Sequence, residues 1–127
     1  MNRLSPLGAL FLAALAASCV SGPVTVPDDM PPAKIVQKAQ EASDVNKYKA
    51  ALQYYGILKE RYGGTGEYLA TAEYEIAFIR YKQKKYADAR RGLENLLARY
   101  KQDAGALPPQ FRVLSEVVLA RIAERGY

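Results

Sequence analysis

The stretch that decides the expected fold reads Ala72-Glu73-Tyr74-Glu75-Ile76-Ala77-Phe78-Ile79-Arg80-Tyr81-Lys82-Gln83-Lys84-Lys85-Tyr86-Ala87-Asp88-Ala89. It contains neither proline nor glycine, and residues that favour helices, such as alanine, glutamate, lysine and arginine, are frequent in it. The polar pair Lys84-Lys85 separates two segments rich in apolar residues. The pattern therefore predicts one helix at 67–83, a short turn, and a second helix at 86–101.

The same pattern continues on both sides of this stretch, because prolines are absent between Pro32 and Pro108. Three more helices are predicted at 33–44, 47–62 and 109–125. Polar, glycine-containing or proline-containing breaks separate the five segments. Pro109 suits the first position of the last helix, because its fixed φ and missing N–H are compatible with a helix start. The sequence predicts an all-α domain over 33–127.

The predicted helices also repeat along the chain. The second and fourth share an apolar stripe at a constant offset, in which Ala51, Leu58 and Tyr62 match Ala89, Leu96 and Tyr100. The third and fifth align at a slightly larger offset, which sets Ala70 opposite Phe111. A period of about 34–40 residues with paired helices is typical of an α-solenoid, whose hairpins bury their apolar faces only against neighbours. We expect about two and a half hairpins in such a stack.

The stretch 72–89 resembles a tetratricopeptide (TPR) repeat. In that resemblance Ala77 takes the small position at which the two helices approach closely, and Tyr81 takes the aromatic position of the first helix. Tyr86 closes the turn, and Ala89 is the small residue of the second helix.

The phrase Leu58-Lys59-Glu60-Arg61-Tyr62, followed by a loop and a new helix, is similar to outer-membrane members of this group. The resemblance is to BamD-type lipoproteins of the β-barrel assembly machine and to the periplasmic repeat protein of the Tol-Pal system. It covers about 33–127. It implies a protein-interaction scaffold in cell-envelope assembly, with β-barrel assembly or Tol-Pal components as partners.

The beginning of the chain has the composition of a bacterial signal peptide: a positive start, an apolar run, and the small residues Ala16-Ala17-Ser18 before Cys19. The apolar run is shorter than the roughly 20 residues that a spanning helix needs. Leu15-Ala16-Ala17-Ser18-Cys19 resembles the lipobox of bacterial lipoproteins, which implies removal of 1–18 and covalent acylation of Cys19. The alternative is an ordinary secretory signal, with Cys19 incidental.

The segment behind Cys19 carries four prolines and one glycine between Val20 and Pro32. Such a composition prevents a helix and favours an extended tether, so 19–32 is interpreted as a spacer that holds the domain up to about 40 Å from the lipid. In the lipoprotein resemblance Val20, in place of aspartate, favours the outer membrane and a domain facing the periplasm.

Few residues suited to catalysis are present. The sequence has no histidine, and its single cysteine is expected to carry lipid. The Gly63-Gly64-Thr65-Gly66 segment lacks the Lys-Ser/Thr of a phosphate-binding loop. Glu73 and Glu75 are two residues apart and should point to different helix faces. We expect no enzyme activity, cofactor, metal or nucleic-acid partner, and a function through binding.

One candidate partner-binding surface is a cluster of six cations near the central turn: Arg80, Lys82, Lys84, Lys85, Arg90 and Arg91. Such a cluster can dock an acidic protein or phosphate-bearing lipid. The alternative is a solvated helix end, where cations interact favourably with the helix dipole.

A second candidate surface combines Tyr74, on the expected concave side, with the last helix, which is apolar almost all round. Its partner-binding residues are Phe111, Leu114, Val118 and Ile122. We expect this helix to complete its burial against another protein or a second copy; the alternative is that it packs into the preceding hairpin. An enclosed pocket around Tyr74 and Phe78 would instead favour a lipoprotein that binds a small ligand or lipid for a transporter.

Overall fold

The computed structural model describes residues 22–127, and these form five α-helices without a β-strand. The helices are α1 (Pro32–Asp44), α2 (Tyr48–Tyr62), α3 (Gly66–Lys82), α4 (Tyr86–Gln102) and α5 (Gln110–Glu124). Every end agrees with the sequence-based expectation to within one residue. The all-α class and the five helices are therefore confirmed for this part of the chain.

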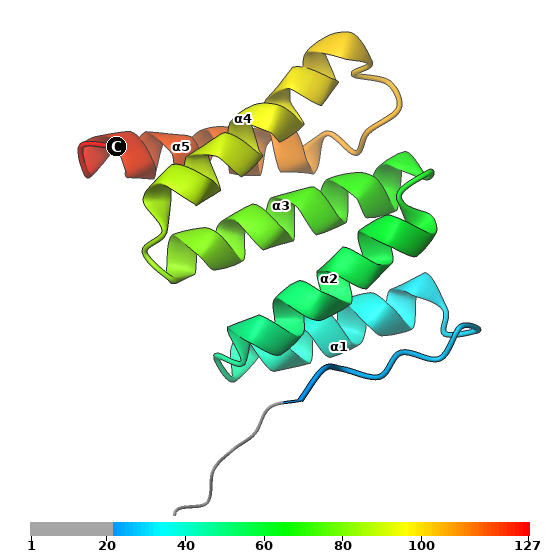
Figure 1. Ribbon diagram of the computed structural model, residues 1–127. Coiled ribbons are helices and arrows are strands. Elements are labelled where there is room, and N and C mark those ends of the chain that lie inside the picture. Colours follow the sequence, from blue (N-terminus) through cyan, green and yellow to red (C-terminus); the bar gives the residue numbers. More distant parts are fainter. Residues whose placement is uncertain (1–21) are drawn as a thin grey trace, which may run out of the picture.

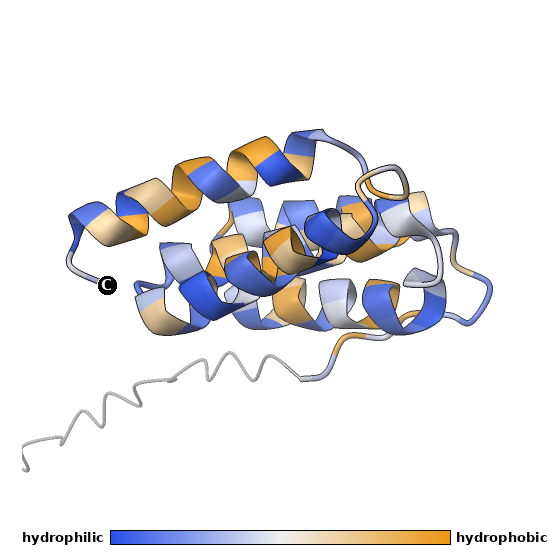
Figure 2. Ribbon diagram, turned by 90° about the horizontal axis from the view of Figure 1, so that it is seen from above, coloured by the Kyte–Doolittle hydropathy of each residue, from blue (hydrophilic) through white to orange (hydrophobic). Residues whose placement is uncertain are grey.

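Each helix packs mainly on the helix that precedes or follows it in the chain, and α5 also contacts α3. Figure 1 shows the resulting order, with α1 and α2 at one end, α3 in the middle, and α4 and α5 at the other end. Viewed from above, α5 lies at one edge of the domain and ends at the C-terminus (Figure 2).

Two hydrophobic cores share α3 between them. One side of α3, including Ala72 and Ile79, packs in a core with α1, α2 and the segment before α1. The other side, including Tyr74 and Ala77, packs in a core with α4 and α5. Because α3 contributes to both cores, it connects the two halves of the domain.

The first two helix pairs are closed by turns of the same construction. Asn46 and Lys84 both take the left-handed conformation, with φ of 59° and 62°. The Lys47 N–H donates to the Ala42 carbonyl at 2.8 Å, and the Lys85 N–H donates to the Arg80 carbonyl at 2.9 Å. These equivalent atoms are separated along the chain by the same offset that relates Ala51 to Ala89, so the two turns repeat at that offset.

The proline-rich segment before α1 forms no helix, as predicted, but it does not extend freely from the domain. The Val24 N–H donates to Gln53 Oε1 at 2.7 Å, and Val26 is buried in the first core. The Arg61 guanidinium donates to the carbonyls of Pro27 at 2.7 Å and Val26 at 2.9 Å. The interpretation as a spacer is therefore wrong for residues 22–31, which pack along α2.

We expect Arg61→Ala to release this segment, because the substitution leaves the carbonyls of Val26 and Pro27 without their charged donor. Charge-assisted hydrogen bonds of this kind contribute about 1.5–3 kcal/mol each when buried, and less at this partly exposed site. Amide hydrogen exchange should become at least about tenfold faster at Val24, equivalent to about 1.4 kcal/mol. Arg90→Ala, an exposed arginine elsewhere, is the control; equal exchange at Val24 in both variants would contradict the docking role.

The predicted signal peptide at 1–18 and the lipidation site Cys19 lie outside the described residues. Among the helices of residues 22–127, none is long and apolar enough to cross a membrane.

Candidate functional site: a groove between α2, α3 and α4

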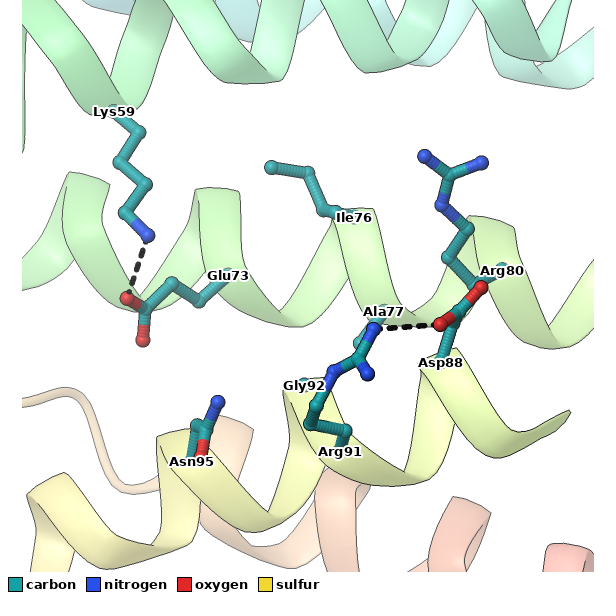
Figure 3. Close-up of a pocket in the computed structure, with 9 residues that line it drawn as sticks. All are labelled: Lys59, Glu73, Ile76, Ala77, Arg80, Asp88, Arg91, Gly92 and Asn95. Carbon is teal, nitrogen blue, oxygen red and sulfur yellow. Dashed lines mark hydrogen bonds and ion pairs between the residues drawn. The ribbon is translucent and has the colours of Figure 1, made fainter. Parts of the chain in front are cut away.

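A groove with a volume of about 300 Å³ lies where α3 is flanked by α2 and α4. Its lining comes from all three helices: Lys59, Glu73, Ile76, Ala77, Arg80, Asp88, Arg91, Gly92 and Asn95. Figure 3 shows Lys59 reaching from α2 toward Glu73, Arg80 at the other end of α3, and Arg91 and Asn95 rising from α4. The groove therefore depends on the relative placement of three helices.

Glu73 ties these helices together at one end of the groove. Its carboxylate lies 3.0 Å from Lys59 Nζ of α2 and accepts two hydrogen bonds of 2.9 Å from Arg99 of α4. The Glu73 side chain is largely buried, while both cations are about half exposed. A paired arginine–carboxylate contact fixes geometry as well as charge, so Glu73 holds α2 and α4 at a defined separation.

The rest of the groove carries two arginines, Arg80 and Arg91, and one carboxylate, Asp88. Arg91 pairs with Asp88 of its own helix at 2.6 Å, and its side chain remains 74% exposed. The Arg80 guanidinium donates to the neutral side chain of Gln83 at 3.2 Å, so that bond does not neutralise its charge. Guanidinium groups present several N–H donors in one plane and bind carboxylate or phosphate groups well. The groove is chemically suited to hold an anionic segment.

The structure divides the predicted cationic cluster among different surfaces. Of its six members, Arg80 and Arg91 line the groove. Lys84 and Lys85 lie in the exposed turn, and Arg90 pairs with Glu94 at 2.8 Å on the outer face of α4. A single docking patch of six cations is therefore not formed.

Lys82, the remaining member of that cluster, makes contacts within the domain. Its Nζ lies 2.5 Å from Ser43 Oγ and sits over the rings of Tyr48 and Phe78, at 5.2 and 5.4 Å from their centroids. These contacts join the end of α3 to the α1–α2 turn. Lys82 thus bridges the two hairpins and does not face the groove.

Tyr74 is placed inside the second core and not on an open concave surface. Only 6% of it is exposed, and its ring packs on Phe78 at 5.8 Å and on Phe111 at 5.4 Å between centroids. The expectation that Tyr74 contacts a partner is therefore wrong, because aromatic neighbours from α3 and α5 already cover its ring.

The predicted partner-binding residues of α5 lie on different sides of the helix. Val118 and Ile122 are buried in the second core, and Phe111 packs against that core. Only Leu114, at 41% exposure, is available to a partner, so the expected role of the other three is also corrected. Because apolar residues occur on several sides of α5, the sequence could not indicate which side would face the core.

Sequence reasoning missed Lys59, Glu73 and Arg99 as a functional group of residues. These residues stand far apart in the chain, and only the packing of α2 and α4 against α3 brings them together. It did anticipate that Glu73 and Glu75 point to different faces.

Glu75 lies away from the groove, in a partly buried position near Tyr55. Burial raises the pKa of the Glu75 carboxyl; the nearby charge of Lys82 opposes this shift and that of Asp44 adds to it. Burial also raises the pKa of the Tyr55 hydroxyl, which has no hydrogen-bond partner among residues 22–127. Within the same residues, no cluster of acidic side chains is arranged to hold a metal ion.

Comparison with known proteins relates the chain to a longer bacterial protein. The chain is 34% identical over 119 residues to an uncharacterized protein of Treponema pallidum (strain Nichols), a match that covers 91% of this chain and 46% of that protein. The chain thus spans less than half the length of this relative. No protein-family profile and no solved structure matches the chain.

Proposed function

We propose that this chain is a lipid-anchored helical-repeat scaffold of the bacterial cell envelope, whose groove binds an acidic segment of a partner protein. The observation that carries the proposal is the groove itself, which Arg80 and Arg91 line and in which Glu73, at the end away from Arg80, joins α3 to α2 and α4. Two helical hairpins with turns of the same construction, followed by α5, support a tetratricopeptide-like stack. Scaffolds of this architecture act by surface complementarity.

The anchor in this proposal is an acylated Cys19, with residues 1–18 removed, at the periplasmic side of the outer membrane. Because the segment before α1 packs on the domain, the domain can extend less far from the lipid than the sequence predicts. Between Cys19 and the contact at Val24 the chain advances five residues, which span at most about 18 Å when fully extended. The scaffold would therefore work close to the membrane surface, and its partners would be envelope proteins, with β-barrel assembly and Tol-Pal components as candidates.

The alternative function, binding of a small ligand or lipid, would need an enclosed pocket around Tyr74 and Phe78. The rings of these two residues stack on each other, and Tyr74 also packs on Phe111. Side chains thus occupy the space where that ligand was expected, which favours the scaffold.

The groove is tested by the binding of a fluorescent hexaglutamate peptide to the full chain, followed by anisotropy. We expect Arg80→Glu/Arg91→Glu to weaken binding at least about tenfold, because two attractive charges become repulsive. Binding to the unmodified chain should weaken as salt rises from about 50 to 300 mM, since the Debye length is about 10 Å at 0.1 M.

Arg90→Glu is the matched control, because Arg90 neighbours Arg91 on α4 but does not line the groove. If Arg90→Glu weakens binding as much as the double substitution, attraction is non-specific and the groove is not the site. Cys19→Ala separately tests the anchor, and membrane attachment and precursor processing that both stay unchanged in this variant would refute acylation at Cys19.

A further inference from the structure

The outward side of α5 carries an exposed apolar stripe. Val113 is 53% exposed and Val117 is 43% exposed, and Ala120 is exposed between them and the end of the helix. Spacings of four and three residues place the three side chains on one face. Ser115 and Ile122 are fully buried on the opposite face. In Figure 2, α5 lies at one edge of the domain and carries several apolar residues along its length.

The pattern of buried residues shows which positions of α5 correspond to which positions of α3. Ser115 and Ile122, which are buried on the side of α5 toward α4, correspond to Ala72 and Ile79, which are buried on the side of α3 toward α2. One shift along the chain relates both pairs. The alignment expected from the sequence, with Ala70 opposite Phe111, is therefore wrong by two residues, which corresponds to a rotation of about 200° around a helix.

In this register the exposed stripe of α5 matches the side of α3 that α4 covers. Val113, Val117 and Ala120 correspond to Ala70, Tyr74 and Ala77, all buried in the second core. At Ala77 the approach of α4 is close: a Cβ on Gly92 would lie 3.0 Å from the Ala77 Cβ. Thus α3 is covered on both sides, whereas α5 is covered on one side only among the described residues.

A glutamate also occupies corresponding positions of α3 and α5. Glu73 of α3 accepts the paired hydrogen bonds of Arg99 from α4, and its counterpart on α5 in the same register is Glu116. Glu116 is exposed on the edge of the apolar stripe. The outward side of α5 therefore repeats both the apolar and the acidic features that α3 uses to hold α4.

We propose that this face of α5 docks an amphipathic helix of a partner protein with the chemistry of α4. Such a helix would bring glycine or alanine against Ala120, leucines against Val113 and Val117, and arginine or lysine to Glu116. A second copy does not offer this helix, because the matching side of α4 is itself buried: Leu93 and Leu96 are fully enclosed. The inference rests on the proposed scaffold function and names a surface separate from the groove.

The test uses a synthetic peptide of residues 85–102, the α4 segment, as a surrogate partner helix for the full chain. We expect saturable binding with a dissociation constant of about 10–100 µM, typical of a small interface. Val117→Asp should weaken it at least about tenfold while the circular dichroism stays unchanged, because Val117 is exposed. Val45→Asp, at a site 62% exposed on the α1–α2 turn, is the matched control and should bind normally.

A charge exchange tests the register. Glu116→Arg should weaken binding of the peptide, and an Arg99→Glu peptide should restore it, which measures the pairwise coupling directly. Absence of saturable binding at about 1 mM peptide would overturn the proposal, because it would place the interaction below the weakest useful affinity. Equal binding of the peptide to the Val117→Asp chain would also overturn the proposal. It would indicate that the peptide replaces the chain's own α4 and does not bind the outward face of α5.

Sedimentation of the chain alone tests whether a second copy of the chain binds this face of α5. A concentration-dependent dimer that Val117→Asp abolishes would assign the face to a second copy and overturn docking of a partner helix. None of the substitutions in this test touches Arg80 or Arg91 of the chain, so the α5 face can fail while the groove stands, and the reverse.

Discussion

Gly66→Ala is expected to destabilise the domain by about 2–3 kcal/mol, the upper part of the range for overpacking. A Cβ at this position would lie 1.9 Å from the carbonyl oxygen of Ala106 and 3.3 Å from Leu107 Cδ2. The first contact is with backbone, which no side-chain rotation relieves. The segment between α4 and α5 would have to move away from the start of α3.

That movement would disturb the second core. Leu107 is buried in this core, and the Tyr100 hydroxyl donates to the carbonyl of Pro108. A loss of about 2–3 kcal/mol corresponds to a fall in melting temperature of about 10–20 °C for a domain of this size. Chemical denaturation measures the free energy directly, with unchanged m-value as evidence that the native fold persists.

Gly64→Ala is the control for this prediction, because a Cβ there meets nothing within 4 Å. It should change the free energy of unfolding by less than about 0.5 kcal/mol. Similar losses in both variants would show that the effect belongs to the turn as a whole and not to the close approach at Ala106.

Leu93→Ala should have a comparable or larger effect, about 2–5 kcal/mol, because Leu93 is fully buried and its loss leaves a cavity. The location of the damage is the more informative result. Leu93 belongs to the core that α4 and α5 share with one side of α3, whereas α1 and α2 pack in the other core. In a stack held by nearest-neighbour contacts, destabilisation concentrates near the substitution.

Amide hydrogen exchange shows how the loss of stability is distributed over the five helices. We expect the Leu93→Ala chain to lose protection most strongly in α4 and α5 and least in α1 and α2. Val117→Ala, which shortens an exposed side chain of α5, should change stability by less than about 0.5 kcal/mol and serves as the control. An equal loss of protection in α1 and α5 would contradict a stack and indicate a single cooperative unit.

Helix positions could be read from the sequence because their ends are set locally. Pro32 begins α1, the glycines at 63–66 end α2, and the prolines at 108–109 precede α5. The repeated turn was also accessible, since Asn46 and Lys84 are related by the same offset as the apolar stripes of α2 and α4. These features depend on neighbours within a few residues.

Features that depend on tertiary placement were not predicted. The contact of Arg61 with Pro27 joins segments that are distant in the chain, and no local sequence pattern indicates this contact. The register between α3 and α5 was misjudged because the segment before α5 is longer than the one before α3, and α5 is apolar on both sides. The groove likewise arises from the packing of three helices on one another, which composition and spacing do not specify.

Photo-crosslinking in the intact envelope tests the central claim most directly, namely that this chain is an interaction scaffold. A photoreactive phenylalanine derivative is placed at Asn95 in the groove, at Val117 on α5, and at Val45 as a control, in cells that naturally make the protein. The scaffold account expects discrete protein adducts from Asn95 and from Val117, and none from Val45. Identical adducts from all three positions, or adducts with lipid alone, would contradict it.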